Sequence, residues 1–369
     1  MVRYLFRSSV VVGLVAVALL AALAYVGYGQ AQGDPTATGD QQSSVFPPDR
    51  IGPLGDAIKV QKRHTGYLMA HPDVVGTAAG LTADGRPAVK VYTKAAGTAG
   101  IPESLDGMQV VVEATGEFFA LKKADTDPSG SKGKGGGQVD TTARFGRPVP
   151  IGVSTGNQGE CSAGTIGARV RNVGNGNVYA LSNNHVYALE NNAPIDSNVL
   201  QPGRFDTGCS VNAGDVIGTL ADFEPIIFSP TASNTIDAAI ALSSTANLGN
   251  ATPSGGYGTP RSATVAAFVG QKVQKYGRTS LLTKGQVTGI NGTILIGYGS
   301  GTARFVNQII VGSRKPFIKN GDSGSLLVTD PDRNPVGLLY ASDSSGKNAI
   351  ANLIDPVLTQ LGVVIDGAP

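Results

Sequence analysis

The sequence predicts a mainly β protein whose short strands close into a barrel or sandwich, preceded by a small α/β domain. Glycine accounts for 51 of the 369 residues and charged residues for only 15%, a composition that suits strands and tight turns better than helices. Short apolar runs rich in Val, Ile and Thr recur between Gly, Asn and Pro turns, which is typical of an all-β domain. A chain of this length exceeds what one hydrophobic core usually serves, so two folded parts are expected.

Residues 1–31 are predicted to be a signal peptide. Arg3 and Arg7 precede an uninterrupted apolar run over 10–26, and small residues follow at the distance expected for a cut, which places the mature start near Gln32. A short arginine-bearing leader of this kind is typical of bacterial proteins. The alternative is an uncleaved anchor, and only then would the protein contact a membrane. Either way the bulk of the chain is extracytoplasmic, whether secreted, periplasmic or in the cell envelope.

A spacer and a small domain follow the leader. Residues 32–48 are polar and carry too little apolar surface to fold. Residues 49–121 are predicted to form a small α/β domain. Its expected elements are a helix over 56–70, a β-hairpin formed by 74–81 and 88–93, one helical turn over 101–105, and a strand-rich run over 108–120.

The clearest boundary in the sequence is a Gly/Lys-rich linker over 122–146, which has hardly an apolar side chain. Residues 147–369 after it are β-rich to their end. Strands are expected over 164–173, 177–181, 216–219, 238–242, 272–276, 285–290, 293–296, 308–311, 326–329, 336–340 and 349–353, and a short helix over 356–361.

The net charge and the cysteine content indicate which binding partners and which cellular compartment to expect. The net charge is only +2 with both signs scattered, so no nucleic-acid partner is predicted. Two cysteines, Cys161 and Cys209, are expected to form a disulfide in an exported protein, and the alternative is a pair of buried thiols. His64 and His71 of the small domain lie near no cysteine or carboxylate cluster, so neither a metal nor another cofactor is predicted.

The most distinctive stretch is 319–328, Lys-Asn-Gly-Asp-Ser-Gly-Ser-Leu-Leu-Val. Glycines on both sides let the backbone turn sharply and leave the Ser323 hydroxyl unshielded. Such a turn can aim the amides of Gly321 and Ser323 at one point, as an oxyanion hole requires. Alone, the stretch would be an ordinary glycine turn before a strand.

A serine hydrolase also needs a base and an acid that orients it. His185 is the only histidine of the β-rich domain, so it must be the base if the domain is catalytic. Asp237 is the best candidate for the acid, because a carboxylate that opens an apolar strand needs a partner such as an imidazole N–H. Its competitors Asp206, Asp215 and Asp222 lie in polar, loop-like surroundings.

The order His185, Asp237, Ser323 is the chymotrypsin-like order. Residues 181–186, Leu-Ser-Asn-Asn-His-Val, resemble the Thr-Asn-Asn-His-Val segment of bacterial trypsin-like and HtrA-like proteases. Residues 321–325 resemble the Gly-Asp-Ser-Gly-Gly/Ser motif of the trypsin superfamily, and 275–280 resemble a Gly-Arg-Thr-Thr hairpin of secreted bacterial members. The resemblance covers residues 150 to 365 and implies a chymotrypsin-like double β-barrel with the site between the barrels.

The resemblance also implies roles for the matching residues. Ser323 would be the nucleophile, His185 the general acid/base and Asp237 its orienting partner, while the amides of Gly321 and Ser323 would bind the oxyanion. Asp322 would brace this loop through a cation, and Arg278, Arg304 and a freed amine near Ile151 are the candidates for it.

This sequence departs from the digestive members of the superfamily in three places. Asn184 replaces an alanine, Val186 replaces a cysteine, and Ser325 stands where glycine is more frequent. The substrate pocket is expected to include Phe317 and the strand over 338–341, with no acidic residue evident. A small or apolar residue before the cut bond is therefore favoured over a basic one.

Two functions are consistent with these observations. The first is an exported serine endopeptidase that acts on protein or peptide substrates. The second is a protease-like binding or scaffold module with little activity. The small domain is either a propeptide that inhibits the peptidase, which the linker favours, or a permanent targeting or substrate-binding module. An esterase fits less well, because its nucleophile motif is Gly-x-Ser-x-Gly and its histidine comes last.

Overall fold

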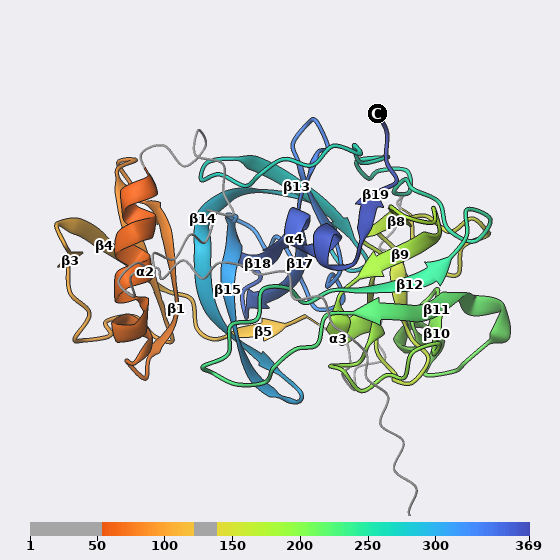
Figure 1. The fold of residues 1–369 in the computed structure, drawn as a ribbon, viewed down its shortest axis with the longest axis horizontal. Helices are drawn as coiled ribbons and strands as arrows, with labels where there is room; N and C mark the ends of the chain where they lie inside the picture. Colours follow the sequence, from red (N-terminus) through yellow and green to blue (C-terminus); the bar gives the residue numbers. More distant parts are fainter. Residues whose placement is uncertain (1–53, 122–138) are drawn as a thin grey trace, which may run out of the picture. The chain divides into compact units, whose positions relative to one another are not determined.

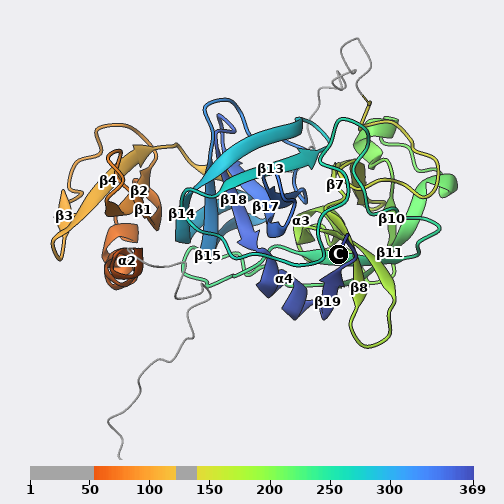
Figure 2. The same cartoon turned by 90° about the horizontal axis from the view of Figure 1, so that it is seen from above.

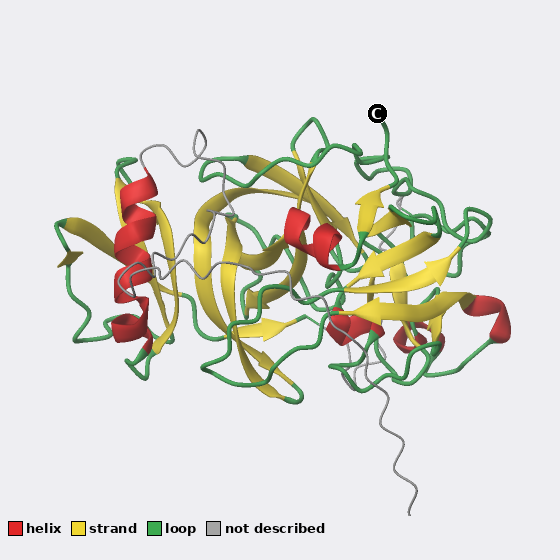
Figure 3. Ribbon diagram, in the orientation of Figure 1, coloured by secondary structure: helices red, strands yellow, loops and turns green. Residues whose placement is uncertain are grey.

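The computed structural model describes residues 54–121 and 139–369. The predicted signal peptide 1–31, the spacer 32–48 and residues 122–138 of the linker lie outside the described residues. Within the described ranges, no helix is both long and apolar enough to cross a membrane. Strands dominate these ranges, and the few helices are short apart from α2 (Figure 3).

Residues 54–121 form one helix and five strands. These are α2 (Gly55–Met69), β1 (Val74–Leu81), β2 (Pro87–Thr93), β3 (Ser104–Leu105), β4 (Met108–Ala114) and β5 (Phe118–Ala120). The helix and the first hairpin agree with the sequence-based expectation. The helical turn expected over 101–105 is wrong, because β3 instead pairs with β4 across Asp106 and Gly107. Both turn residues have positive φ, 49° and 77°, and Asp-Gly is a preferred pair for such a hairpin turn.

Residues 139–369 form two curled sheets (Figure 1). The first contains β6 (Ser154–Asn157), β7 (Gly164–Thr165), β8 (Ala168–Asn172), β9 (Val178–Ser182), β10 (Asn198–Leu200), β11 (Val216–Phe223), β12 (Ala239–Ser243) and β19 (Val363–Ile365). The second contains β13 (Lys272–Gly277), β14 (Leu281–Tyr298), β15 (Gly301–Gly312), β16 (Leu326–Thr329), β17 (Pro335–Asp343) and β18 (Asn348–Leu353). Helices α3 (Asn184–Tyr187) and α4 (Ile354–Gln360) follow β9 and β18.

Both sheets are barrels. In the second sheet, neighbouring strands run in the order β13, β16, β17, β18, β15, β14, and β14 pairs back to β13, which closes the ring. In the first sheet the edge strand β7 is followed within a few residues by β8. Ile166 between them donates to the carbonyl of Val153, next to β6, and Gly167 donates to the carbonyl of Leu181 in β9, so this segment connects the two ends of the sheet. Each barrel has its own apolar core, and a third buried cluster, which includes Leu181, Leu326 and Leu338, joins them.

The small N-terminal region shares the sheet of the second barrel (Figure 2). Strand β1 pairs with β14 in antiparallel register, and β5 lies between β14 and β17. The sequence predicted two separate strands over 285–296, but β14 is one strand whose pairing with β15 shifts register three times between Val287 and Ile294. Asn291 takes a left-handed conformation there, and its amide donates to Gln61 of α2 at 2.5 Å. The predicted break is therefore the point where α2 docks.

Cys161 and Cys209 form a disulfide across a separation of 48 residues. Removing it by the double substitution to serine should lower the free energy of unfolding by about 3–4 kcal/mol, because the unfolded chain loses a constraint on a long loop. Chemical denaturation of the protein with and without the substitution, both in a Ser323→Ala background, measures this. An unchanged midpoint would contradict the prediction.

Candidate active site

His185 is held at the junction between β9 and the single turn of α3. Its backbone N–H donates to Asp237 Oδ1 at 3.2 Å, and its Nδ1 lies 2.6 Å from Asp237 Oδ2. Both side chains are fully buried. Because an ionised carboxylate can only accept, Nδ1 carries the proton, and the lone pair of Nε2 is left for a second partner. Nε2 has no hydrogen-bond partner among the described residues.

Asp237 lies two residues before β12, and four residues bind it through five hydrogen bonds. Besides the two bonds from His185, Tyr298 Oη donates to Oδ2 at 2.9 Å. The backbone on both sides is also fixed: Asp237 N–H donates to Asn352 Oδ1 at 3.0 Å, and Asn183 Nδ2 donates to the Asp237 carbonyl at 2.7 Å. The burial of this carboxylate is therefore compensated by specific donors.

Two of the competing acids are committed to other partners. Asp206 accepts from Arg278 Nε at 2.7 Å, and Asp215 accepts from Arg144 Nη2 at 2.7 Å. Asp222 accepts from the amide of Phe223 at 2.8 Å. No bond between any of them and His185 is present in the described part of the chain, where Asp237 faces this imidazole.

Tyr298 is a site residue that sequence reasoning missed. It ends β14, and Glu190 fixes the following hairpin by accepting from the amides of Gly299 and Ser300. Burial, and secondarily the negative charge of Asp237, raise the pKa of Tyr298 well above its usual value, so the hydroxyl remains a donor. A tyrosine more than 60 residues from Asp237 in the chain carries no local signal for this role.

Ser323 lies in the sharp turn that the sequence predicts. Gly321 and Gly324 have φ values of +94° and +89°, which other residues rarely adopt. A Cβ on Gly324 would come within 2.2 Å of Ser182 Oγ, so the turn packs directly against the end of β9. Thr165 fastens the turn by donating its N–H to the Ser323 carbonyl at 2.7 Å. Ser323 Oγ lies 3.2 Å from the Tyr340 carbonyl and donates to it.

The cation beside Asp322 is Lys275, which none of the three sequence-based candidates named. Lys275 Nζ lies 3.2 Å from Asp322 Oδ2, and both side chains are fully buried. Arg278 instead pairs with Asp206, and Arg304 donates to the carbonyls of Thr231 and Ala232. Its strand reads Lys-Val-Gln-Lys-Tyr-Gly, and nothing in this sequence sets Lys275 apart from Lys272.

Opposing effects set the charges of this buried pair. Burial would raise the pKa of Asp322, but Lys275, the Ser280 hydroxyl and the amides of Thr279 and Ser280 together bring that pKa below its ordinary value. Burial lowers the pKa of Lys275, and the charge of Asp322 opposes this. The carboxylate thus stays ionised and holds the loop by also accepting from the amide of Lys319 at 2.9 Å.

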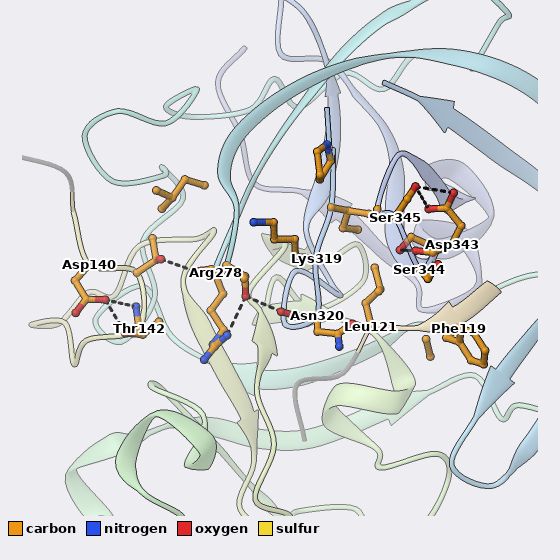
Figure 4. Close-up of a pocket in the computed structure, with 18 of the residues that line it drawn as sticks. Phe119, Leu121, Asp140, Thr142, Arg278, Lys319, Asn320, Asp343, Ser344 and Ser345 are labelled. Atoms are coloured by element: carbon orange, nitrogen blue, oxygen red, sulfur yellow. Dashed lines mark hydrogen bonds between the residues drawn. The ribbon is translucent and has the colours of Figure 1, made fainter. Parts of the chain in front are cut away.

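A strand of the chain itself lies at this site. Strand β5 pairs antiparallel with β17, and the next residue, Leu121, continues the pattern. Leu121 N–H donates to the Tyr340 carbonyl at 3.1 Å, and the Leu121 carbonyl accepts from the Gly321 amide at 2.7 Å. One of the two amides predicted for an oxyanion hole is thus already bonded to a peptide carbonyl. Leu121 also lines an adjoining cavity of about 700 Å³, next to Asn320 (Figure 4).

The described residues show no metal centre: within 54–121 and 139–369, no group of three or more His, Cys, Asp and Glu side chains is placed to hold an ion. His64 instead lies 2.9 Å from Asp106. The described site thus contains an imidazole bonded to Asp237 and a serine turn whose Gly321 amide is bonded to a peptide carbonyl, and among the described residues no hydrogen bond joins His185 to Ser323. These are the groups that acyl transfer to a serine requires.

No protein-family model matches the sequence, and no curated protein does. Among solved structures, matches include a glutamic acid specific serine protease (20% identity, 59% of this chain and 100% of the other, TM-score 0.41). Thermobifida fusca protease A also matches (17% identity, 60% and 100%, TM-score 0.42), as does Cellulomonas bogoriensis chymotrypsin (20% identity, 59% and 97%, TM-score 0.39). The two barrels described above agree with the double β-barrel that the sequence predicts.

Replacing Lys275 by methionine should destabilise the protein by about 3–5 kcal/mol, because Asp322 would remain buried without its countercharge. Lys284→Met is the matched control. It removes an ion pair with Asp330 whose lysine side chain is 59% exposed, so it should cost about 0–1 kcal/mol. Denaturant titrations at several pH values measure the loss of unfolding free energy in both variants.

The same titrations test the charge of Asp322. A carboxylate whose pKa is lowered by folding stabilises the native state above the unfolded pKa, and this contribution is lost as the pH falls through the folded pKa. The difference in the free energy of unfolding between wild type and Lys275→Met should therefore shrink below about pH 4. A gap that widens in acid would show that Asp322 is not ionised in the native protein.

Tyr298→Phe should lower peptidase kcat/KM by about 10- to 100-fold, the usual worth of a hydrogen bond to a buried charged group. The ring stays in place, so its packing is kept. Tyr67→Phe, on the exposed face of α2 with 62% of the residue accessible, serves as control. Equal activities of the two variants would exclude a positioning role for the Tyr298 hydroxyl.

Proposed function

We propose that this chain is an exported serine endopeptidase that hydrolyses peptide bonds in protein or peptide substrates. Ser323 is the nucleophile, His185 the general acid and base, and Asp237 the residue that orients the imidazole. The amides of Gly321 and Ser323 bind the oxyanion. The observation that carries the proposal is the bond from the Gly321 amide to the Leu121 carbonyl, because it places a peptide carbonyl beside the Ser323 turn.

The proposed reaction follows from which atoms of the site can donate and accept a proton. Nε2 of His185 has a free lone pair and takes the Ser323 proton as Oγ attacks the carbonyl carbon. The Ser323 hydroxyl must first leave its bond to the Tyr340 carbonyl. The imidazolium is stabilised by Asp237, and it then gives its proton to the leaving amine. Water, activated by the same imidazole, hydrolyses the resulting acyl-enzyme.

The alternative is a protease-like binding or scaffold module with little activity. The buried partners of Asp237 favour the enzyme, since a module that only binds has no use for a desolvated carboxylate–imidazole pair. An extracytoplasmic location is part of the proposal and is supported by the disulfide between Cys161 and Cys209.

We also propose that residues 49–121 act as an inhibitory propeptide rather than a permanent targeting module. Support comes from Leu121, whose two backbone groups occupy the positions at which a substrate would bond to Tyr340 and Gly321. A substrate cannot enter this groove until the strand leaves it.

A fluorophosphonate or sulfonyl fluoride probe tests the enzyme proposal. The wild-type protein should be labelled on Ser323, and Ser323→Ala should not be labelled. Asp237→Asn should lower kcat by about 10⁴-fold, because the wrong imidazole tautomer would face the serine. A folded, processed protein that takes up no probe would refute the proposal.

A further inference from the structure

We propose that Asn184 and Glu190 are positioning residues of this peptidase, and that they keep the Tyr298 hydroxyl on Asp237 by fastening one barrel to a hairpin of the other. This inference rests on the proposed function and concerns the same site. The groups that act together are called the latch, which consists of Asn184, Glu190, Asn191 and residues 298–300 at the turn between β14 and β15.

The loop that follows α3 has an unusual backbone. Leu189, Glu190 and Asn191 have φ values of 52°, 58° and 74°, so three consecutive residues other than glycine are left-handed. This conformation is unfavourable for residues with a Cβ, and more so for leucine or glutamate than for asparagine. Strain of this kind persists only where the surrounding contacts fix it, and it gathers at functional sites.

Asn191 binds this loop to the turn that carries the imidazole. Its Oδ1 accepts from Asn184 Nδ2 at 2.8 Å, and Asn184 Oδ1 accepts in return from the Asn191 amide at 3.2 Å. Asn191 also bonds to both backbone groups of Ile226, at 2.9 Å to the amide and 2.8 Å to the carbonyl. Asn184 is fully buried and directly precedes His185. The position of the loop is therefore tied to that of the general base.

Glu190 extends from the same loop to the hairpin of the second barrel. Its Oε2 accepts from the Ser300 amide at 2.7 Å, and its Oε1 accepts from the Gly299 amide at 3.3 Å. The residue is only 8% exposed. Bonds to a charged acceptor are stronger than bonds between neutral groups, so this carboxylate holds the turn between β14 and β15.

Tyr298 is the residue next to these two amides. Its hydroxyl donates to Asp237 Oδ2 at 2.9 Å, and its ring meets the His185 imidazole edge-on with 5.9 Å between the centroids. The Phe228 ring also meets it edge-on, at 5.6 Å. A displacement of the hairpin turn by about 1 Å would take the hydroxyl out of bonding range of Asp237.

These contacts close a ring that begins and ends at the general base. Every step is a hydrogen bond or a link between neighbours in the chain, and the ring passes through His185, Asn184, Asn191, Glu190, Gly299, Tyr298 and Asp237. Because the ring is closed, a shift of the hairpin changes the orientation of the carboxylate that orients the imidazole.

The latch is not needed to hold the two barrels together. The buried apolar cluster between them, which includes Leu181 and Leu338, already does so. The digestive members of the superfamily that the sequence resembles carry alanine in place of Asn184, and alanine could form neither bond with Asn191. Loss of the latch should therefore affect the site more than the fold.

Kinetics of the full chain test the latch. Glu190→Gln keeps the shape of the side chain but removes its charge, and Asn184→Ala removes both bonds to Asn191. Each should lower kcat about 3- to 10-fold, the effect of losing one ordinary hydrogen bond, with KM changed less than about 2-fold. Glu224→Gln is the matched control, because its carboxylate accepts from Gln360 at 2.7 Å and not from the hairpin. It should change neither constant.

Double variants with Tyr298→Phe separate positioning from general support of the fold. If the latch acts through the Tyr298 hydroxyl, adding Glu190→Gln or Asn184→Ala to Tyr298→Phe should lower kcat by less than about 2-fold more. Losses that multiply would show that the latch acts independently of this hydroxyl and would overturn the inference. A lower unfolding midpoint with an unchanged kcat would also overturn it, since a purely structural role gives that result.

The assay substrate is a tetrapeptide p-nitroanilide with leucine before the cut bond, and reactive serines are counted with the fluorophosphonate probe so that kcat refers to accessible sites. Leucine suits the apolar preference expected from the sequence. That expectation missed Asp343, an acidic residue that lines the cavity. Its Oδ1 accepts from the Lys347 amide at 3.2 Å and its Oδ2 from Asn348 Nδ2 at 2.8 Å, so the carboxylate is committed to its own loop.

A second readout does not depend on peptidase activity. In the Ser323→Ala chain, the Nδ1 proton of His185 that bonds to Asp237 is expected to give a low-field NMR resonance, which Asp237→Asn should abolish. Tyr298→Phe and Glu190→Gln should both shift this resonance, while Glu224→Gln should leave it in place. A resonance that moves with Tyr298→Phe but not with Glu190→Gln would overturn the inference.

Failure of this inference is distinguishable from failure of the proposed function. Absence of probe labelling in the folded wild type would refute the peptidase, and the resonance would still report whether Glu190 orients the imidazole. A labelled wild type whose kcat and resonance are both unaffected by Glu190→Gln would overturn the latch alone.

Discussion

The active region depends on the high cost of burying a carboxylate without partners. Asp237 and Asp322 are both fully buried, and each is surrounded by donors that come from distant parts of the chain. Asp237 is satisfied by His185 and Tyr298, and Asp322 by Lys275 and Ser280. Because a missing donor leaves a charge unsolvated, these bonds fix the positions of the elements that supply them.

The two carboxylates hold different parts of the same site. Asp237 lies before β12 of the first barrel and reaches Tyr298 of β14 in the second, so its bonds cross between the barrels. Asp322 precedes Ser323 and is bound by residues of β13 and of the turn after it. The imidazole is thus oriented by a contact between barrels, whereas the turn that contains Ser323 is held from within one.

The edge of β17 is occupied by a strand of the same chain. An extended peptide that adds to a sheet edge obtains affinity from main-chain bonds and specificity from the pockets for alternate side chains. In this chain that edge is occupied by β5, which also pairs with β14, the strand that ends at Tyr298. Gly297 makes room for it, since a Cβ there would come within 2.8 Å of the Phe119 ring. Occupation of the groove and orientation of Asp237 therefore involve the same strand.

The sequence by itself determined the elements whose signals are local. Glycines around Ser323 encode a turn, alternating apolar runs encode strands, and a single histidine in the β-rich part left one candidate for the base. Asp237 was identified because a carboxylate that opens an apolar strand needs a partner. These inferences required only neighbouring residues and an inventory of the chain.

Only the tertiary structure decided the contacts that bring distant residues together. Lys275, Tyr298 and Leu121 each meet the site through pairing of strands, and nothing next to them in the sequence distinguishes them from ordinary strand residues. The helical turn expected before Asp106 and the break expected at Asn291 failed for the same reason, because pairing with another strand outweighs local preference. The register of β5 on β17, which brings Leu121 to the Ser323 turn, goes with the burial of the Phe118 and Leu121 side chains.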